Sequence, residues 1–344
     1  MPLHKGILTA AATGIALGIC STAAQAQQSV EQFYTGKKTI TMSVGYAPGG
    51  SYDLYARLVA RHLGRFIPGQ PAVVPQNMPG AGSLQAANYI YAVAPKDGSA
   101  IGALGETVAM EQALQNPGAK YDAAKLTWIG RIASSNNIHL VWHTSKAKSV
   151  EEAKTIETTM AGTGPANLAE TVPRLLNALI GTKFKVVSGY PSSGPAMLAM
   201  ERGEVDGTGT SWAVIKAQHQ DWLRDKKITI ILQDLPERDP ELADVPALLE
   251  FAKTDADKQL LTLYASGGAI GRAYTAPPNL PPAIAAALRE GFQKMAKDPE
   301  LLAEAKKMNL SIEPADHLLL QKVVEHTVKA DESVRKRVRE IFAN

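Results

Sequence analysis

A glycine turn between an apolar run and an amphipathic run is the segment of this sequence best suited to chemistry. Ile40–Val44 is apolar, Pro48–Gly50 follows it, and an amphipathic pattern begins at Ser51 and Tyr52. This order predicts a strand, a tight turn and a helix start. A helix start binds anions because its first amides have no intrahelical partner and the helix dipole favours negative charge. The turn therefore predicts a site for a small anion; the alternative is that its glycines only permit a tight turn.

A second turn repeats this arrangement. The apolar run Ala72–Gln76 leads to Gly80-Ala81-Gly82, and a helical pattern covers Ser83–Tyr91. Each helix start carries roughly half a positive charge, so the two turns together could hold one carboxylate even without a lysine or arginine. Asp53, in the first turn of the first helix, fits a structural cap or dipole partner better than a ligand contact.

Other polar and aromatic residues are candidates for the same site. Glu106 and Thr107 follow the strand-like run Ser99–Leu104, and open α/β sheets bind ligands at the carboxyl ends of their strands. Glu106 would repel a carboxylate unless it receives an amine or hydroxyl of the ligand, so a ligand contact and a contact across a cleft both stay open. Tyr46 and Trp212 fit stacking on a planar ligand and burial in the core equally well.

Turns in the second half of the chain carry short hydrogen-bonding side chains and glycines. We expect them to contact the ligand from the second lobe, and the alternative is that they only cap helices. They are Thr163, Gly164, Asn167, Ser192, Ser193 and Gly194.

Catalytic motifs are weak or absent. His139 and His143 are four residues apart, a metal-binding spacing on a helix, but they lie in the strand-like run Ile138–Thr144, where four residues span roughly 13 Å. Gln85 stands where a dinucleotide motif starting at Gly80 requires its third glycine. No G-x-S-x-G nucleophile elbow occurs in the sequence. We therefore expect no enzyme activity, no metal and no cofactor.

Strand-like and helix-like segments alternate along the chain, which predicts an α/β fold with largely parallel sheets. The polar stretch Ser134–Asn137 marks a crossing into a second lobe, and the chain returns between Leu263 and Pro278. We expect lobe 1 to contain residues 27–134 and 264–344 and lobe 2 residues 135–263, with hinge crossovers and a ligand cleft between them. One last amphipathic helix is expected over Asp316–Ile341.

The N-terminus reads as an export signal. Lys5 precedes the apolar run Ile7–Ile19, and Ala24-Gln25-Ala26 is a small-residue cleavage site. Residues 1–26 are thus expected to be removed, leaving the protein in the periplasm. Cys20 is the only cysteine, so the exported chain has no disulfide or thiolate metal site. Its formal charge falls with the loss of Lys5 from +3 to +2, which argues against a nucleic-acid partner.

Several motifs in order resemble one family. VGYAPGGSYDLYARLVARHL, QNMPGAGSLQAANYI and APKDGSAIGAL are similar to the substrate-binding proteins of tripartite tricarboxylate transporters, the TctC or Bug family. In the second half, MAGTGPANLAE and SSGPAMLAMERGEVDG match more loosely, with Asp206 at the family's acidic position. The sequence departs from the family where Tyr190-Pro191-Ser192 replaces the usual Tyr-Lys-Gly, which removes a lysine near the cleft.

The resemblance implies a type II periplasmic-binding-protein fold and a receptor that binds a small organic carboxylate without chemistry. Dicarboxylates, tricarboxylates, acidic amino acids and aromatic acids are the family's ligands, and membrane permease subunits are its partners. A ligand-sensing module for a membrane signalling partner and an exported enzyme are the alternatives. We expect a monomer. The ligand-binding residues expected are Tyr46, Gly49, Gly50, Ser51, Tyr52, Gly80, Ala81, Gly82, Glu106, Thr107, Thr163, Gly164, Asn167, Ser192, Ser193, Gly194, Asp206 and Trp212.

Overall fold

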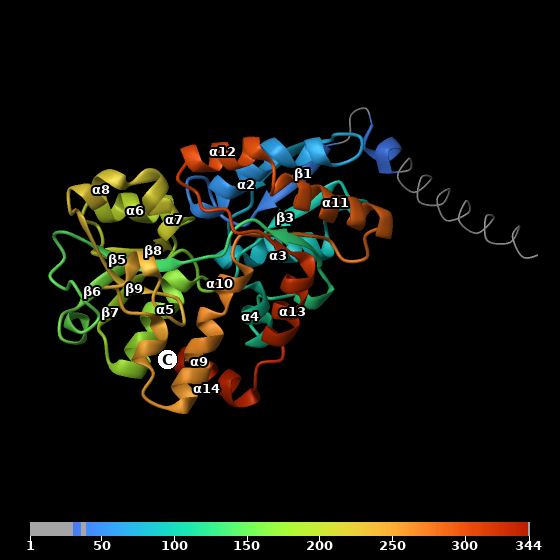
Figure 1. Cartoon of the computed structure of the whole chain (residues 1–344). Coiled ribbons are helices and arrows are strands. Elements are labelled where there is room, and N and C mark those ends of the chain that lie inside the picture. The colour runs from blue at the N-terminus through green and yellow to red at the C-terminus, as the bar shows by residue number, and fades with distance from the viewer. Residues whose placement is uncertain (1–29, 36–38, 343–344) are drawn as a thin grey trace, which may run out of the picture.

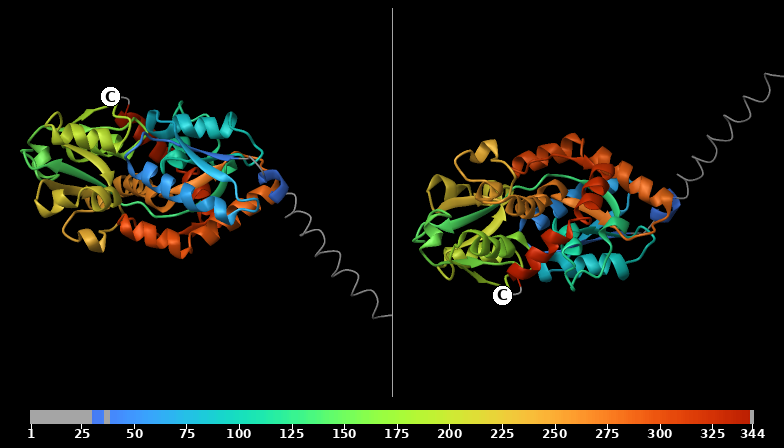
Figure 2. Two further views of the ribbon diagram at one scale, coloured as in Figure 1. Left: turned by 90° about the horizontal axis from the view of Figure 1, so that it is seen from above. Right: turned by 90° about the horizontal axis from the view of Figure 1, so that it is seen from below.

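Two β-sheets, one in each half of an elongated molecule, organise the chain (Figures 1 and 2). The computed structural model describes residues 30–35 and 39–342, so the expected signal, residues 1–26, lies outside the described residues. Within these ranges no helix has the length and apolar character needed to cross a membrane. The first sheet has the order β11-β4-β10-β3-β1-β2 and contains β1 (Thr39–Val44), β2 (Ala72–Asn77), β3 (Ala100–Ala103), β4 (Thr127–Arg131), β10 (Ala273–Ala276) and β11 (Ala315–Asp316).

The second sheet has the order β7-β6-β8-β5-β9. Its strands are β5 (Asn137–Trp142), β6 (Thr158–Ala161), β7 (Phe184–Val187), β8 (Gly207–Ser211) and β9 (Ile228–Gln233). The expectation of largely parallel sheets is wrong in part. β1 pairs in parallel with β2 and β3, and β6 with β7 and β8, but β10 and β5 are antiparallel to both of their neighbours. Each of these two strands enters its sheet from the other sheet, so no crossover helix packed on its own sheet joins it in parallel to a neighbouring strand.

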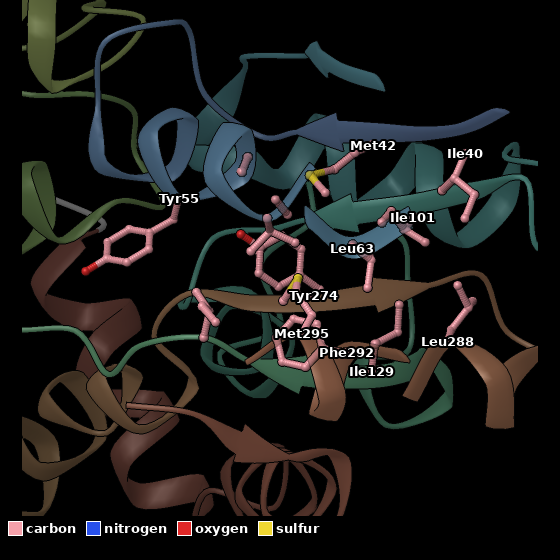
Figure 3. Packing of buried hydrophobic residues seen from close by; sticks show 14 of the residues in the cluster. Ile40, Met42, Tyr55, Leu63, Ile101, Ile129, Tyr274, Leu288, Phe292 and Met295 are labelled. Atoms are coloured by element: carbon pink, nitrogen blue, oxygen red, sulfur yellow. The ribbon is translucent and has the colours of Figure 1, made fainter. Parts of the chain in front are cut away.

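Helices cover both faces of the first sheet. One face carries α2 (Ser51–Leu63), α11 (Pro282–Met295) and α12 (Pro299–Lys307), and the other carries α3 (Leu84–Ala92), α4 (Val108–Ala113) and α13 (His317–Thr327). Neighbouring strand residues alternate between the two cores, as the pleat requires: Ile129 and Tyr274 pack on the first face, Trp128 and Ala273 on the second. Figure 3 shows Tyr274 and Phe292 together inside the first core. The centroids of their rings are 5.5 Å apart.

The second sheet is layered in the same way. One face packs against α5 (Leu168–Ile180), α9 (Asp255–Ala265) and α14 (Glu332–Phe342), and the other against α6 (Ser193–Glu201), α7 (Trp212–Gln218) and α8 (Gln220–Arg224). The single helix expected over Asp316–Ile341 is wrong. The chain forms two helices, because α13 packs on the first sheet whereas Val334 and Val338 of α14 pack with α5 and α9 on the second.

The two sheets are joined by chain segments that hydrogen-bond to each other. The Arg272 amide donates to the Ala133 carbonyl (2.9 Å), the Ile132 amide to the Arg272 carbonyl (3.1 Å), and the Ser135 amide to the Gly268 carbonyl (3.0 Å). The short helix α10 (Gly267–Ile270) lies in the returning segment. We propose that these paired segments are the hinge between lobe 1 and lobe 2, and that α14 extends lobe 2.

A buried carboxyl beside the junction of the two halves predicts a pH dependence of stability. Burial raises the pKa of Glu111 in α4 to about 7, against an ordinary value of 4.5, although Asn116 donates a hydrogen bond to it. Between these pH values the folded protein holds a proton that the unfolded chain has lost. The free energy of unfolding is therefore expected to fall as pH rises from about 4.5 to about 7, by up to ~3 kcal/mol.

Urea unfolding across this pH range tests that expectation with Glu111→Gln. The neutral amide keeps an acceptor for Asn116 and removes the titration, so the variant should be more stable than the wild type above pH 7 and similar to it near pH 4.5. Glu237→Gln, at an exposed position, is the control and should follow the wild type. If Glu111→Gln retained the wild-type pH dependence, another group would be responsible for it.

Candidate functional site

A small cavity lies between the two lobes, where strands and helix starts of both converge. Its volume is about 40 Å³, far below the several hundred Å³ typical of sites for drug-sized ligands. The residues that line it come from both sheets and are mostly polar. They are Tyr46, Gly50, Ser51, Tyr52, Glu106, Asn137, Thr163, Asn167, Leu168, Ala169, Ser192, Ser193, Gly209, Thr210, Ser211, Asp234 and Arg272.

The first glycine turn reaches the cavity through the start of α2. Gly50 is the N-cap of this helix, and no side chain caps its amides. Gly50, Ser51 and Tyr52 line the cavity, whereas Gly49 does not. The carboxylate of Asp53 accepts a hydrogen bond from the Gly49 amide (3.2 Å). Asp53 therefore fixes the turn rather than facing a ligand.

Asp53 is itself held in a small polar network. Arg57 donates to it (2.9 Å), and the Asn77 side-chain amide donates both to Asp53 (2.9 Å) and to the Tyr46 carbonyl (2.8 Å). Burial alone would raise the pKa of Asp53, but the hydrogen bonds from Arg57, Asn77 and Gly49 lower it below its ordinary value. Asp53 is thus ionised near neutral pH and holds β1, β2 and the turn in register.

A second helix start faces the first across the cavity. Ser192 is the N-cap of α6, which also has no side-chain cap, and a Cβ atom placed on Gly50 would lie 3.0 Å from the Ser193 hydroxyl. The start of α5 lines the cavity through Leu168 and Ala169, but its Ala169 amide already donates to the Asn167 side chain (2.9 Å). The starts of α2 and α6 therefore make this part of the cavity favourable for negative charge.

Two stacked tyrosines form the wall on the first-lobe side. The rings of Tyr46 and Tyr52 lie 4.5 Å apart and nearly parallel. The Tyr46 hydroxyl accepts from Asn167 (2.8 Å) and donates to the Gly82 carbonyl (3.3 Å), and the Tyr52 hydroxyl accepts from the Glu106 amide (2.8 Å). Burial raises the pKa of both tyrosines, so both hydroxyls stay protonated at neutral pH.

A buried ion pair at the hinge side is the feature that sequence reasoning missed. Arg272, 3% exposed, contacts Glu106 (Nη1–Oε2 3.3 Å), and its guanidinium lies 4.2 Å from the centroid of the Tyr52 ring. The other oxygen of Glu106 accepts a hydrogen bond from Asn137. Glu106 in lobe 1 is thus linked to the first residue of β5, and Arg272, which is not among the predicted site residues, also lines the cavity.

The second glycine turn lies outside the cavity, as a contact between the lobes. A Cβ atom on Gly82 would lie 2.7 Å from the Ala166 carbonyl carbon, and one on Gly164 would lie 2.5 Å from the Gly82 amide nitrogen. Thr107 likewise donates to the Ala166 carbonyl (2.8 Å), and Gly194 packs on the Gly49 backbone. The predicted residues that form contacts between the lobes rather than the cavity lining are Gly49, Ala81, Gly82, Thr107, Gly164 and Gly194, and Gly80 lies against Gln85 of its own lobe.

Two further predicted residues have structural partners away from the cavity. The Asp206 carboxylate accepts from the Thr159 amide (2.7 Å) and hydroxyl (2.6 Å), which ties β6 to the start of β8. The Trp212 indole donates to Glu241 (2.6 Å), and its ring packs in the core under α6 and α7. The structure therefore gives both residues a role in the packing of lobe 2.

The important residues missed by sequence reasoning are Asn137, Thr210, Asp234 and Arg272, all of which line the cavity. Three of them stand at the end of a strand or directly beside one, because Asn137 begins β5, Asp234 follows β9 and Arg272 precedes β10, whereas Thr210 lies within β8. Open α/β sheets bind ligands at the carboxyl ends of their strands, and this signal marks Asp234 after β9 as it marks Glu106 after β3. Arg272 and Asn137 belong to the crossings, which the sequence pattern did not mark as part of a site.

One group of potential metal ligands lies elsewhere, between α2 and α12. His62, Asp298 and Glu300 have ligand atoms within 4.8 Å of one another. Arg65 already pairs with both carboxylates, and His62 contacts Glu304 (Nε2–Oε2 2.6 Å). These charges compensate each other, so the cluster is an ion-pair network that joins the two helices.

Comparisons with known proteins bear on the fold of the chain. A UPF0065 protein of Bordetella bronchiseptica is 30% identical over 181 residues, 50% of this chain, and the chain spans about half (53%) of that relative. The periplasmic binding protein BugD has a TM-score of 0.71 at 18% identity, covering 89% of this chain and 98% of BugD. MatC from Rhodopseudomonas palustris, solved with bound malate, has a TM-score of 0.65 at 20% identity, covering 88% of this chain and 98% of MatC.

A TctC solute-binding protein from Polaromonas has a TM-score of 0.55 at 18% identity, covering 88% of this chain and 98% of that protein. No protein-family model matches the chain. The predicted two-lobed α/β fold is confirmed. These findings bear out the resemblance to the substrate-binding proteins of the TctC and Bug family, whose periplasmic-binding-protein fold this chain has.

Proposed function

We propose that this protein is a periplasmic solute receptor that encloses a small organic carboxylate between its two lobes and performs no chemistry on it. The observation that carries the proposal is the pair of uncapped helix starts, α2 and α6, facing each other across a buried cavity. Helix starts that face one space favour a bound anion there. The cavity is small, which favours a ligand of few atoms.

The polar groups of the cavity support binding rather than catalysis. A serine nucleophile needs a histidine or another base within hydrogen-bond reach. Ser192 donates instead to the Pro48 carbonyl (3.3 Å), and no histidine is among the residues that line the cavity in the described part of the chain.

The contacts between the lobes suggest how binding is coupled to shape. Besides the second glycine turn, the Ala47 amide donates to the Pro191 carbonyl (3.2 Å), and Asn167 donates to Tyr46. These contacts surround the cavity and belong to a closed arrangement. A ligand that touches both α2 and α6 gains contacts only when the lobes are closed, so it shifts the protein toward that state. Membrane permease subunits that recognise the closed surface complete the proposal, together with export by the signal in residues 1–26 and a monomeric state.

A thermal-shift screen of the purified exported protein against organic acids tests the proposal. A ligand at 100 times its dissociation constant adds about 2.7 kcal/mol to the free energy of unfolding, which gives a clear rise in melting temperature. Gly50→Leu is the matched variant: the Gly50 backbone (φ −91°) accepts any residue, but a Cβ atom there would lie 3.0 Å from the Ser193 hydroxyl, so a leucine would obstruct the close approach of the starts of α2 and α6. We expect at least one carboxylate to stabilise the wild type and not this variant. A folded protein that no acid stabilises would contradict the proposal.

A further inference from the structure

Two polar residues of lobe 2 that line the cavity each have a buried side-chain atom without a hydrogen-bond partner. Thr210, 6% exposed, lies in β8, and Asp234, 3% exposed, follows β9. The Thr210 hydroxyl and Asp234 Oδ1 have no hydrogen-bond partner among the described residues. Buried polar atoms in native proteins are nearly always satisfied. Both atoms belong to residues of the cavity wall, so a ligand group that enters the cavity is the natural partner.

The chemistry of this partner follows from how Asp234 is held. His139, 2% exposed, lies beside it in β5; both carboxylate oxygens are within 3.2 Å of its Nε2, but only Oδ2 has hydrogen-bond geometry. The His139 Nδ1 has no partner within the described ranges. The hydrogen bond with His139 therefore uses only Oδ2 of the carboxylate. Oδ1 of the Asp234 carboxylate is left as an open acceptor atom, which suits a cationic donor.

The opposite wall offers no free cation that would attract a second anionic group. Arg272 is the only lysine or arginine among the residues that line the cavity, and it is paired with Glu106. The cavity wall therefore contains two carboxylates and one guanidinium. A dicarboxylate would bring its second negative charge into a space that already holds Asp234, whereas an ammonium group would neutralise that charge.

We infer that the ligand is a small zwitterion of the amino-acid type, an inference that rests on the proposed function. Its carboxylate lies at the starts of α2 and α6, and its ammonium group donates to Asp234 Oδ1 and the Thr210 hydroxyl. The small volume of the cavity favours a short side chain. This ligand class differs from the malate found in MatC, because two negative groups would compete with Asp234.

Matched ligand pairs that differ only in the amino group test this inference by calorimetry on the purified protein. The pairs are alanine with propionate, aspartate with succinate, and glutamate with glutarate. We expect the amino acid of at least one pair to bind at least tenfold more tightly than its partner. Equal or tighter binding of the partner acids in every pair would overturn the inference and leave the proposed receptor intact. A folded protein that binds no carboxylate at all would overturn both.

Two substitutions assign the effect to this part of the cavity. Asp234→Asn should weaken amino-acid binding at least tenfold and leave the binding of the partner acid unchanged or tighter. Thr210→Val, which keeps the shape of the side chain, should weaken amino-acid binding several-fold. It tests the same part of the cavity if Asp234→Asn does not fold. Asp206→Asn is the control, because Asp206 lies in the same lobe but is bound to Thr159. An unchanged preference in both test variants, or an equal loss in the control, would contradict the assignment.

Discussion

Replacing Arg272 with methionine is expected to lower the free energy of unfolding by about 3–5 kcal/mol, because the change leaves Glu106 charged and buried without its partner. Both side chains are almost fully buried, with 2% and 6% of their surface exposed. Methionine has a similar length and supplies apolar contact with Tyr52, so the loss reports mainly the charge. Urea unfolding of the unliganded protein measures it.

A double variant separates the ion pair from general damage to the hinge. Arg272→Met with Glu106→Gln removes both charges and leaves no uncompensated ion, so it should be more stable than Arg272→Met alone. Arg224→Met is the surface control: Arg224 pairs with the exposed Asp225 and should change stability by less than about 0.5 kcal/mol. Additive losses in the double variant would mean that Arg272 and Glu106 do not depend on each other.

The sequence predicted the strands and helix starts well because they rest on local signals. The apolar runs before Gly49 and Gly80, and the amphipathic runs after them, are visible within a few residues. The pairing of Arg272 with Glu106 joins residues 166 positions apart, and nothing near Gly271 distinguishes this arginine from one on a surface. The antiparallel placement of β10 and β5 also depends on how the crossings enter the sheets.

Most of the predicted ligand contacts that the structure places outside the cavity lining are glycines. A glycine turn at a helix start is equally suited to a bound anion and to the close approach of another backbone. Gly50 lines the cavity, whereas Gly82 and Gly164 pack against each other across the lobes. The sequence shows the same motif in both cases. The difference lies in which backbone stands opposite when the two lobes meet.

A single methyl group at Gly82, added by Gly82→Ala, is expected to prevent the lobes from closing. Gly82 has φ +67°, and a Cβ atom there would lie 2.7 Å from the Ala166 carbonyl carbon and 2.9 Å from the Asn167 amide nitrogen. Backbone atoms at the start of α5 cannot move aside as a flexible side chain would. We expect Gly82→Ala to weaken ligand binding about 100-fold or more, because the ligand loses its contacts with lobe 2 when the closed state is blocked.

Gly181 offers a matched control for the backbone strain. It has φ +77° at the end of α5, and a Cβ atom there would contact nothing within 4 Å. Alanine at either position should lower the free energy of unfolding by about 1–2 kcal/mol through the left-handed backbone. Only Gly82→Ala should also lose ligand affinity by calorimetry and show a larger radius of gyration by small-angle X-ray scattering in the presence of ligand. Equal affinities in the two variants would mean that the contact at Gly82 does not control closure, and that binding depends on α2 and its turn alone.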